Sequence, residues 1–252
     1  MEQTIIRKLR EIEEKEHVRI LLAVESGSRA WGFPSTDSDY DVRFIYVRQK
    51  EDYLRLEKTR DVIELPLDDV LDINGWDLQK TLRLFRKSNP TLFEWFSSPI
   101  VYMETPFAET FRAMMGNYFS AKRSLYHYIH MADKNRHEYL MDDMVKIKKY
   151  FYVLRPVLAC RWILEKKTPP PMRLSELMEA ELPVSLQGEV NRLLDLKQNA
   201  PEVKMTAKVD VINTYLKESI ENIQNVLKTL EETKLADWQE LNHLFLQQLQ
   251  SV

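Results

Sequence analysis

An apolar run, a Gly-Ser turn and two closely spaced aspartates follow one another between residues 18 and 47. Residues 18–24 are apolar and rich in β-branched side chains, so we expect a buried strand there. Residues 41–47 predict a second strand. Asp39 and Asp41 lie where that second strand begins, and their i, i+2 spacing makes the two side chains point the same way. The segment therefore predicts two strands joined by a turn, with a pair of carboxylates at the start of the second strand.

The turn between the two predicted strands contains Gly27 and Ser28. Glycine permits a tight turn and a close approach of the main chain to a ligand. We expect Ser28 to cap a short helix, because a serine side chain accepts hydrogen bonds from the first amide groups of a helix. Such a helix start favours an anion, for example a polyphosphate. The turn therefore predicts phosphate binding next to Asp39 and Asp41.

Two simpler explanations of this segment fit it less well. Asp37, Asp39 and Asp41 alternate as in a calcium loop, but that loop needs Gly and Glu where this chain has Val42 and Arg48. A polar turn with solvated carboxylates is the stronger alternative, because Ser, Asp and Pro are common in turns. That alternative explains neither the Gly-Ser pair nor the strand that follows the aspartates.

The order Gly-Ser, ten residues, Asp-x-Asp and an apolar residue resembles the signature of the DNA polymerase-β-like nucleotidyltransferase superfamily. Four segments resemble one branch of it, the predicted nucleotidyltransferases often associated with RNA ligases: residues 25–33, 38–43, 74–80 and 148–156. Ser26 stands where the wider superfamily usually has an apolar residue, which agrees with that branch. The resemblance covers most of residues 18–165.

The resemblance implies a polymerase-β-like nucleotidyltransferase domain with a small mixed sheet. It also implies an activity, the transfer of a nucleoside monophosphate from a nucleoside triphosphate to a hydroxyl or phosphate acceptor with release of pyrophosphate. Four residues of the motif are expected to bind the nucleotide: Gly27, Ser28, Arg29 and Ser38. The branch implies an RNA end as the acceptor, while a protein hydroxyl or a small molecule fits the residues equally well.

The superfamily uses a third carboxylate from a neighbouring strand, and this chain offers candidates. Residues 61–65 and 70–73 are typical of short strands, joined by a turn at residues 66–69 that contains two aspartates. In the second of these strands Asp72 points away from the face that carries its apolar neighbours. Asp72 is therefore our choice for the third metal ligand or general base.

Asp77 is the alternative to Asp72 as the third carboxylate. It lies at the start of a helix predicted over residues 76–85. An acidic residue at that position also stabilises the helix dipole. Stabilisation of the helix is the stronger explanation of Asp77, and the choice between the two acids stays open at this point.

Three carboxylates suit a divalent metal ion, Mg²⁺ or Mn²⁺. Mg²⁺ takes oxygen ligands and is usually held by one or two carboxylates together with substrate phosphates. We expect Asp39 and Asp41 to bind the ion that touches the triphosphate, and Asp72 to complete a second metal site and help remove the acceptor's proton. Phosphoryl transfer depends mainly on positioning and electrostatics, so we predict no covalent nucleophile.

A predicted helix over residues 142–166 carries a second set of candidates. Lys148, Tyr152, Arg155, Ala159 and Trp162 recur at the spacing of one helical stripe. Lysine and arginine could hold a triphosphate and the aromatic rings could stack on a base. The alternative is a mixed surface face whose aliphatic stems cover the core. With the resemblance, we favour a nucleotide-binding role for the Lys, Tyr and Arg of this stripe.

Composition restricts the class of protein further. The chain has 252 residues, 44% of them apolar, and a net charge of −3, so an RNA acceptor would have to meet a local basic patch. Its single cysteine excludes an internal disulfide. We find no apolar signal region near Met1 and no run of about 18 apolar residues, which indicates a cytoplasmic protein without a membrane partner.

The sequence pattern changes near residue 105. Before it, strands alternate with helices, including a short helix that begins at Pro90 after a capping Asn89. After it, helical periodicity dominates, with breaks at proline-containing segments. We therefore expect an α+β fold with a catalytic nucleotidyltransferase domain over residues 1–104. A helical domain over residues 105–252 is expected to contribute to nucleotide or acceptor binding.

Two other functions use the same residues. A nucleotide-binding regulatory module would keep the pocket without turnover, and a metal-dependent phosphodiesterase would use the same acids for hydrolysis. The presence of both Asp39 and Asp41 favours an enzyme over a regulatory module. The sequence has no His-Asp cluster at metal-ligand spacing, which disfavours the phosphodiesterase.

Overall fold

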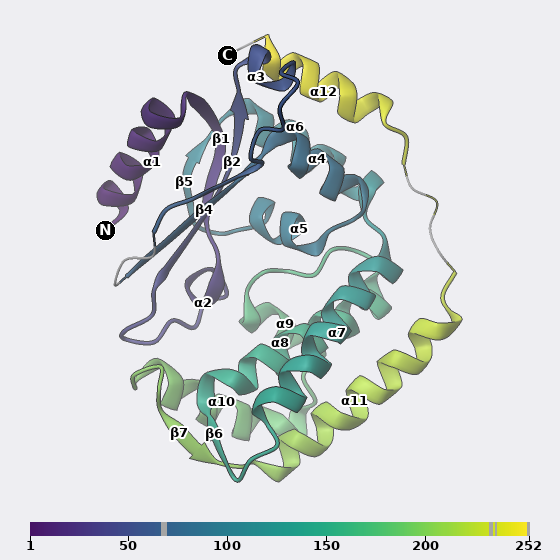
Figure 1. Ribbon diagram of the computed structural model, residues 1–252. Coiled ribbons are helices and arrows are strands. Elements are labelled where there is room, and N and C mark those ends of the chain that lie inside the picture. Colours follow the sequence, from purple (N-terminus) through teal and green to yellow (C-terminus); the bar gives the residue numbers. More distant parts are fainter. Residues whose placement is uncertain (67–69, 232–233, 235, 251–252) are drawn as a thin grey trace. The chain divides into compact units, whose positions relative to one another are not determined.

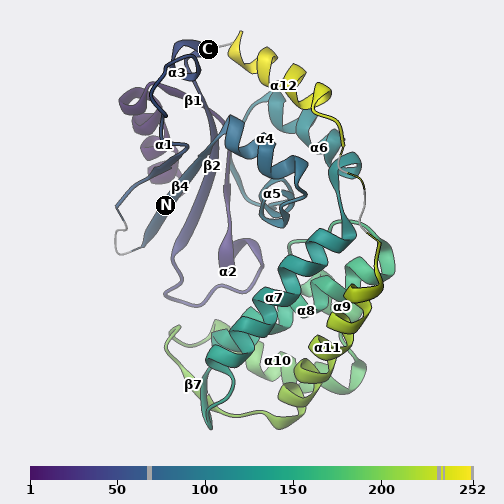
Figure 2. The ribbon, with the colours of Figure 1, turned by 45° about the vertical axis from the view of Figure 1, so that its right-hand side comes forward.

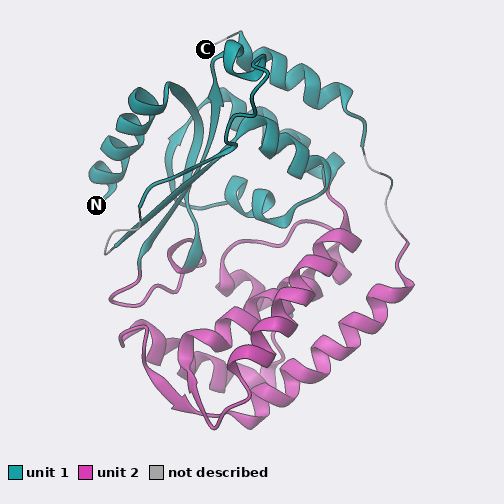
Figure 3. Ribbon diagram, in the orientation of Figure 1, with its two compact units in different colours: residues 1–27, 39–118, 234–252 teal, residues 28–38, 119–233 magenta. Residues whose placement is uncertain are grey.

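The chain forms two compact units in the computed structural model, which describes residues 1–66, 70–231, 234 and 236–250 (Figure 3). Unit 1 comprises Met1–Gly27, Asp39–Tyr118 and Lys234–Val252. Unit 2 comprises Ser28–Ser38 and Phe119–Thr233. Strands and helices occur together in both units, so the predicted α+β class is confirmed.

Unit 1 contains a five-stranded sheet with the strand order β3-β4-β2-β1-β5 (Figure 1). Its strands are β1 (Val18–Glu25), β2 (Tyr40–Arg48), β3 (Val62–Glu64), β4 (Leu71–Asp77) and β5 (Val101–Glu104). β2 and β4 run parallel, and the other neighbouring strands are antiparallel. The small mixed sheet is as predicted, and the two strands predicted on either side of the Gly-Ser turn are the neighbours β1 and β2.

Helices cover both faces of this sheet. On one face, α1 (Glu2–Glu16) packs Ile5, Leu9 and Ile12 against the side chains of β2 that include Phe44 and Tyr46. On the other face lie α4 (Leu78–Arg86), α5 (Pro90–Phe96) and α6 (Pro106–Tyr118), as Figures 1 and 2 show. Two further helices belong to unit 1, α3 (Lys50–Tyr53) and α12 (Gln239–Leu249). The sheet is thus the middle layer of unit 1.

β4 is longer than the sequence predicted. The expected strand over residues 70–73 continues to Asp77, and the helix expected from residue 76 begins at Leu78. β2 pairs with β4 along its whole length, as far as Asp77. β3 pairs with the second half of β4, from Asn74 to Trp76. The predicted start of this helix was wrong because ladder hydrogen bonds on both sides outweigh the helical pattern of the sequence.

Unit 2 is mainly helical. Its helices are α7 (Ala121–Tyr139), α8 (Ile147–Lys166), α9 (Leu174–Glu181), α10 (Val184–Gln198) and α11 (Asp210–Thr229). Unit 2 also contains a small antiparallel pair of strands, β6 (Met144–Lys146) and β7 (Met205–Ala207) (Figure 1). Residues 28–38 also belong to this unit, and Phe33 packs against Phe151 of α8 with ring centroids 5.2 Å apart.

The two compact units differ from the two predicted domains. α6 and α12 group with the sheet, and residues 28–38 group with the helices, so the units do not divide the chain at residue 104. The functional division into residues 1–104 and 105–252 stays a prediction. The turn predicted at residues 66–69 falls largely on residues 67–69, which lie outside the described part. Within the described ranges, no helix has the length and apolar character needed to cross a membrane.

Gly75, in β4, should not tolerate a side chain. A Cβ built on Gly75 would lie 2.1 Å from Cε2 of the buried Phe44 ring, whereas a Cβ on Gly116 in α6 would have no described atom within 4 Å. We expect Gly75→Ala to lower the free energy of unfolding by about 1–3 kcal/mol, because overpacking displaces the ring. Gly116→Ala should leave it unchanged or raise it, since alanine favours helix. Urea denaturation measures both, and equal midpoints would contradict the packing described here.

Candidate functional site

Two aspartates of unit 1 lie side by side on the parallel strands β2 and β4. Asp41 is the register partner of Asp72, so the two side chains share one face of the sheet. Arg43 lies between them, and its Nη2 is 3.1 Å from Asp41 Oδ1 and 2.6 Å from Asp72 Oδ2. The side chains of Asp41 and Asp72 are 30% and 41% exposed, so a ligand can reach both carboxylates. This pair is the centre of the candidate site.

The main chain of Asp41 is fixed by the end of β1. Ser26 N donates to Asp41 O at 2.8 Å, and Asp41 N donates to Glu25 Oε1 at 2.8 Å. Glu25 is fully buried, and its other oxygen accepts a hydrogen bond from the Tyr102 hydroxyl. Sequence reasoning assigned no role to Glu25, although an acidic residue that ends an apolar strand was a usable signal. Glu25 is thus a buried support for Asp41.

Gly27 makes a close approach to the Asp41 side chain. Its φ of +59° lies in the left-handed region, and a Cβ at this position would fall 1.9 Å from Asp41 Oδ2. The predicted tight turn is present at Gly27, and its main chain lies close to the Asp41 side chain, while its approach to a ligand stays a prediction. The glycine leaves room for the Asp41 carboxylate where any other residue would displace it.

Asp39 lies one residue before β2 and is exposed. In the described part of the chain, no three His, Cys, Asp or Glu side chains are grouped closely enough to hold a metal ion. The structure thus brings Asp41 and Asp72 together without gathering Asp39 into a group of three with them. Two carboxylate donors still fit Mg²⁺ or Mn²⁺, because such ions are commonly held by one or two carboxylates and complete their shell with substrate phosphates.

Asp77 lies at the other end of β4 from Asp72 and has a different role. Its carboxylate accepts hydrogen bonds from Gln79 N at 2.7 Å and from the Tyr53 hydroxyl at 2.7 Å, so it caps α4. Burial raises the pKa of Asp77 above its usual range. Asp72, and not Asp77, is the acid that lies beside Asp41.

Residues 28–38 of unit 2 form a loop whose ends are tied together. Ser28 Oγ lies 3.2 Å from Ser38 Oγ, and Arg29 Nη2 donates to Ser38 O at 2.7 Å. Ser28 was expected to cap a helix, but it is the second residue of the four-residue helix α2 (Gly27–Ala30). Its side chain instead contacts Ser38, because the loop returns to its own start. Ser28, Arg29 and Ser38, which are all predicted to bind the nucleotide, are therefore neighbours.

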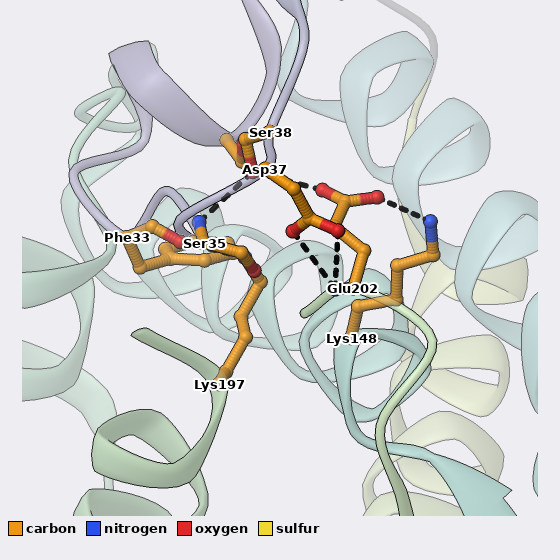
Figure 4. Close-up of polar contacts among 8 residues, drawn as sticks. Phe33, Ser35, Asp37, Ser38, Lys148, Lys197 and Glu202 are labelled. Atoms are coloured by element: carbon orange, nitrogen blue, oxygen red, sulfur yellow. Dashed lines mark hydrogen bonds and ion pairs between the residues drawn. The ribbon is translucent and has the colours of Figure 1, made fainter. Parts of the chain in front are cut away.

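Two residues from distant parts of the sequence hold this loop (Figure 4). Glu202 accepts hydrogen bonds from Ser38 Oγ at 2.8 Å and from Lys148 Nζ. Ser38 and Lys148 are both predicted to bind the nucleotide. Lys197 donates to Phe33 O at 2.8 Å and to Ser35 Oγ at 2.9 Å. Sequence reasoning missed Lys197 and Glu202, because nothing in their local sequence links them to a loop more than 160 residues away.

Lys197 is 3% exposed, and its burial is electrostatically costly. Burial lowers the pKa of Lys197 from its ordinary value to about 8. The two oxygens that accept from its amino group, one on Phe33 and one on Ser35, compensate part of this cost. A buried lysine with two acceptors on the loop is a strong anchor for residues 33–35.

The predicted stripe on α8 is not one open face. Arg155 is 2% exposed and Ala159 is fully buried. The Arg155 guanidinium donates to Met172 O at 3.2 Å through Nη2 and lies 4.7 Å from the Trp31 ring centroid. Tyr152 packs edge-on against the same Trp31 ring, with 6.1 Å between centroids. These contacts give Arg155 and Tyr152 a packing role around Trp31, while their nucleotide binding stays a prediction.

Comparisons with known proteins place these observations in a family context. The family model RlaP, the RNA repair pathway DNA polymerase beta family, matches residues 1–247. The uncharacterized protein YcgL of Bacillus subtilis (strain 168) is 51% identical over 254 residues, covering 100% of this chain and 98% of that protein. The family match confirms the resemblance drawn from the motif of residues 25–43.

A solved structure is also similar to this chain. It is a nucleotidyltransferase-like protein from Exiguobacterium sibiricum 255-15, with a TM-score of 0.32 and 12% identity, and the match covers 98% of this chain and 80% of that one. A TM-score and identity this low support no conclusion about fold or function.

Gly27→Ala should weaken Mn²⁺ binding, and Gly32→Ala should not. Both glycines have positive φ, +59° and +87°, so alanine adds backbone strain at each. Only at Gly27 does the new Cβ meet the Asp41 carboxylate, since no described atom lies within 4 Å of a Cβ on Gly32. We expect a roughly 10- to 100-fold weaker affinity for Gly27→Ala, measured by electron paramagnetic resonance of free Mn²⁺. Equal affinities of the two variants would show that the Gly27 contact does not position Asp41.

Proposed function

Because the chain belongs to the RlaP family, the RNA repair pathway DNA polymerase beta family, we propose that it is a metal-dependent enzyme that adds a nucleotide to an RNA end. In this reaction a nucleoside triphosphate donates its nucleoside monophosphate to a hydroxyl or phosphate of the RNA, and pyrophosphate leaves. The observation that carries the proposal is the pair Asp41 and Asp72, which face the same way on parallel strands and share one cation, Arg43. Two carboxylates that face the same way offer oxygen ligands to a divalent ion, and triphosphate oxygens would complete its shell.

The residues of unit 1 would each have a separate task. Asp39 and Asp41 would hold Mg²⁺ or Mn²⁺, with Asp72 as a further ligand or as the base that takes the acceptor's proton. When bound, the ion supplies charge stabilisation to the phosphates and lowers the pKa of the attacking hydroxyl. Arg43 keeps Asp41 and Asp72 in place through its two short contacts and offsets their mutual repulsion.

The nucleotide would be bound by the turn and by the loop of residues 28–38. Gly27 would let the main chain approach the phosphates, and Ser28 and Ser38 would offer hydroxyl groups to them. Arg29, which donates to Ser38 O, and Lys148, which pairs with Glu202, would supply positive charge to the phosphates.

Tyr152 and Arg155 would support nucleotide binding through Trp31, the ring that both contact. Tyr152 is half-buried, so part of its ring can also stack on a base, whereas Arg155 is 2% exposed. The proposed contribution of Arg155 is therefore to hold the loop of residues 28–38 in place.

The double variant Asp39→Asn with Asp41→Asn should remain folded and lose nucleotide transfer. The purified protein would be incubated with each α-labelled nucleoside triphosphate, Mg²⁺ or Mn²⁺, total cell RNA and cell protein. We expect label in the RNA fraction with the natural protein and none above background with the double variant, because the removed charges are those that hold the ion. Asp142→Asn with Asp143→Asn removes two exposed charges elsewhere and is the matched control, which should label RNA normally.

The outcomes separate this proposal from its alternatives. Unchanged labelling by the Asp39 and Asp41 variant would reject the assigned acids. Label in the protein fraction would support nucleotide transfer but would show that the acceptor is a protein and not RNA. Binding of the triphosphate by the natural protein without transfer to any fraction would favour a nucleotide-binding regulatory module.

A further inference from the structure

A cavity of about 380 Å³ lies in unit 1 where the parallel strands β2 and β4 end. Its volume falls within the range of small-ligand pockets. Six cationic side chains contribute to its lining: Arg48, Arg55, Lys58, Arg60, Lys80 and Arg83. Four acidic side chains also contribute, so the lining is net positive in a chain whose net charge is −3. The excess of positive charge favours an anionic ligand.

Three of the four acidic residues of this cavity are already engaged by the protein. Asp77 caps α4 and accepts the Tyr53 hydroxyl, as described above. Asp61 lies 3.2 Å from Lys80 Nζ, and Asp52 lies 3.2 Å from Arg55 Nη2. Arg60 pairs with Glu64 at 2.6 Å. These ion pairs leave Arg48, Lys58 and Arg83 as the cations, and Glu57 as the exposed acid, that can face a ligand.

Arg48 lines the cavity and has an unsatisfied donor. Its Nε is buried and has no hydrogen-bond partner in the part of the chain that the structure describes. Its Nη1 and Nη2 donate to the carbonyl oxygens of Glu16 and Arg60, each at 3.5 Å, the outer limit of a hydrogen bond. The guanidinium also lies 5.2 Å from the centroid of the Tyr46 ring, and the charge of the Asp77 carboxylate acts on it. The Arg48 side chain is half-buried, and a guanidinium nitrogen that is buried without an acceptor is costly unless a ligand supplies one.

We propose that this cavity binds a phosphate group. Phosphate offers several oxygen acceptors and carries negative charge, one unit in an RNA backbone and up to about two in a free phosphate, which suits the planar donor set of Arg48 with Lys58 and Arg83 nearby. Asp41 and Arg48 are seven residues apart on β2, about 23 Å at 3.3 Å per residue, and their odd and even positions place them on opposite faces of the sheet. The cavity is therefore separate from the acids of the candidate active site.

Two sources could supply this phosphate: the backbone of an RNA chain, or a free small anion such as inorganic phosphate or pyrophosphate. Both are tested on the full chain with EDTA present, so that metal-dependent binding at Asp39, Asp41 and Asp72 does not contribute. Fluorescence anisotropy follows a labelled single-stranded RNA, and isothermal titration calorimetry follows inorganic phosphate and pyrophosphate. Neither measurement depends on nucleotide transfer, so failure of the proposed function would leave this test intact.

Two variants test the cavity and one serves as the control. Arg48→Gln removes the guanidinium with the unsatisfied donor, and Lys58→Gln with Arg83→Gln removes two exposed charges whose loss should not affect folding. Arg7→Gln with Arg10→Gln removes two exposed charges from α1 in the same unit and is matched to the second variant. We expect both cavity variants to bind the ligand about tenfold more weakly, as lost charge-assisted hydrogen bonds imply, and the control to bind normally.

Each outcome decides the proposal. Weaker RNA binding by the cavity variants alone supports an RNA backbone phosphate, and weaker binding of phosphate or pyrophosphate alone supports a free anion. Equal weakening by the cavity variants and the control would mean that only net charge matters, and the cavity site would be rejected. Natural protein that binds none of these probes would reject it as well.

Discussion

The hydrogen bond from Asp41 N to the buried Glu25 carboxylate is the contact on which the candidate active site depends. It joins the end of β1 to the start of β2, next to the bond from Ser26 N to Asp41 O. Without its acceptor, the Asp41 amide would be an unsatisfied donor, at a cost of about 1–3 kcal/mol if it stayed buried. Glu25 and Ser26 hold the main chain of Asp41, and Gly27 leaves room for its side chain. The position of Asp41 therefore depends on the residues just before the Gly-Ser turn as well as on the turn itself.

Pairing between strands then determines which acid joins Asp41. β2 and β4 are parallel and in register, so Asp72 lies beside Asp41, and Asp77 lies five residues away at the far end of β4. The long pairing of β4 also moved Asp77 from a helix to the last residue of a strand, where its carboxylate caps α4. The two ends of the same parallel pair therefore have different chemistry: acids at the start of the strands and a net positive cavity at their end.

Local sequence was sufficient to predict the strands on either side of the turn, the glycine of the turn and the Asn89 cap of α5, because each depends on near neighbours. It did not predict Arg43 between the two acids, since that contact needs the β2–β4 register. Lys197 and Glu202 were missed for the same reason, as their partners lie more than 160 residues away. Arg155 has a helical spacing that fits an exposed stripe, yet the packing of Trp31 buries it.

The central claim is that Asp39 and Asp41, at the start of β2, bind a divalent ion for nucleotide transfer. Anomalous diffraction from crystals grown with Mn²⁺ and a non-hydrolysable nucleoside triphosphate tests it most directly. The account predicts a Mn²⁺ peak at coordination distance, about 2.0–2.3 Å, from a carboxylate oxygen of Asp39 or Asp41, with triphosphate oxygens completing its shell. A Mn²⁺ peak bound to the triphosphate with neither Asp39 nor Asp41 among its ligands would contradict it.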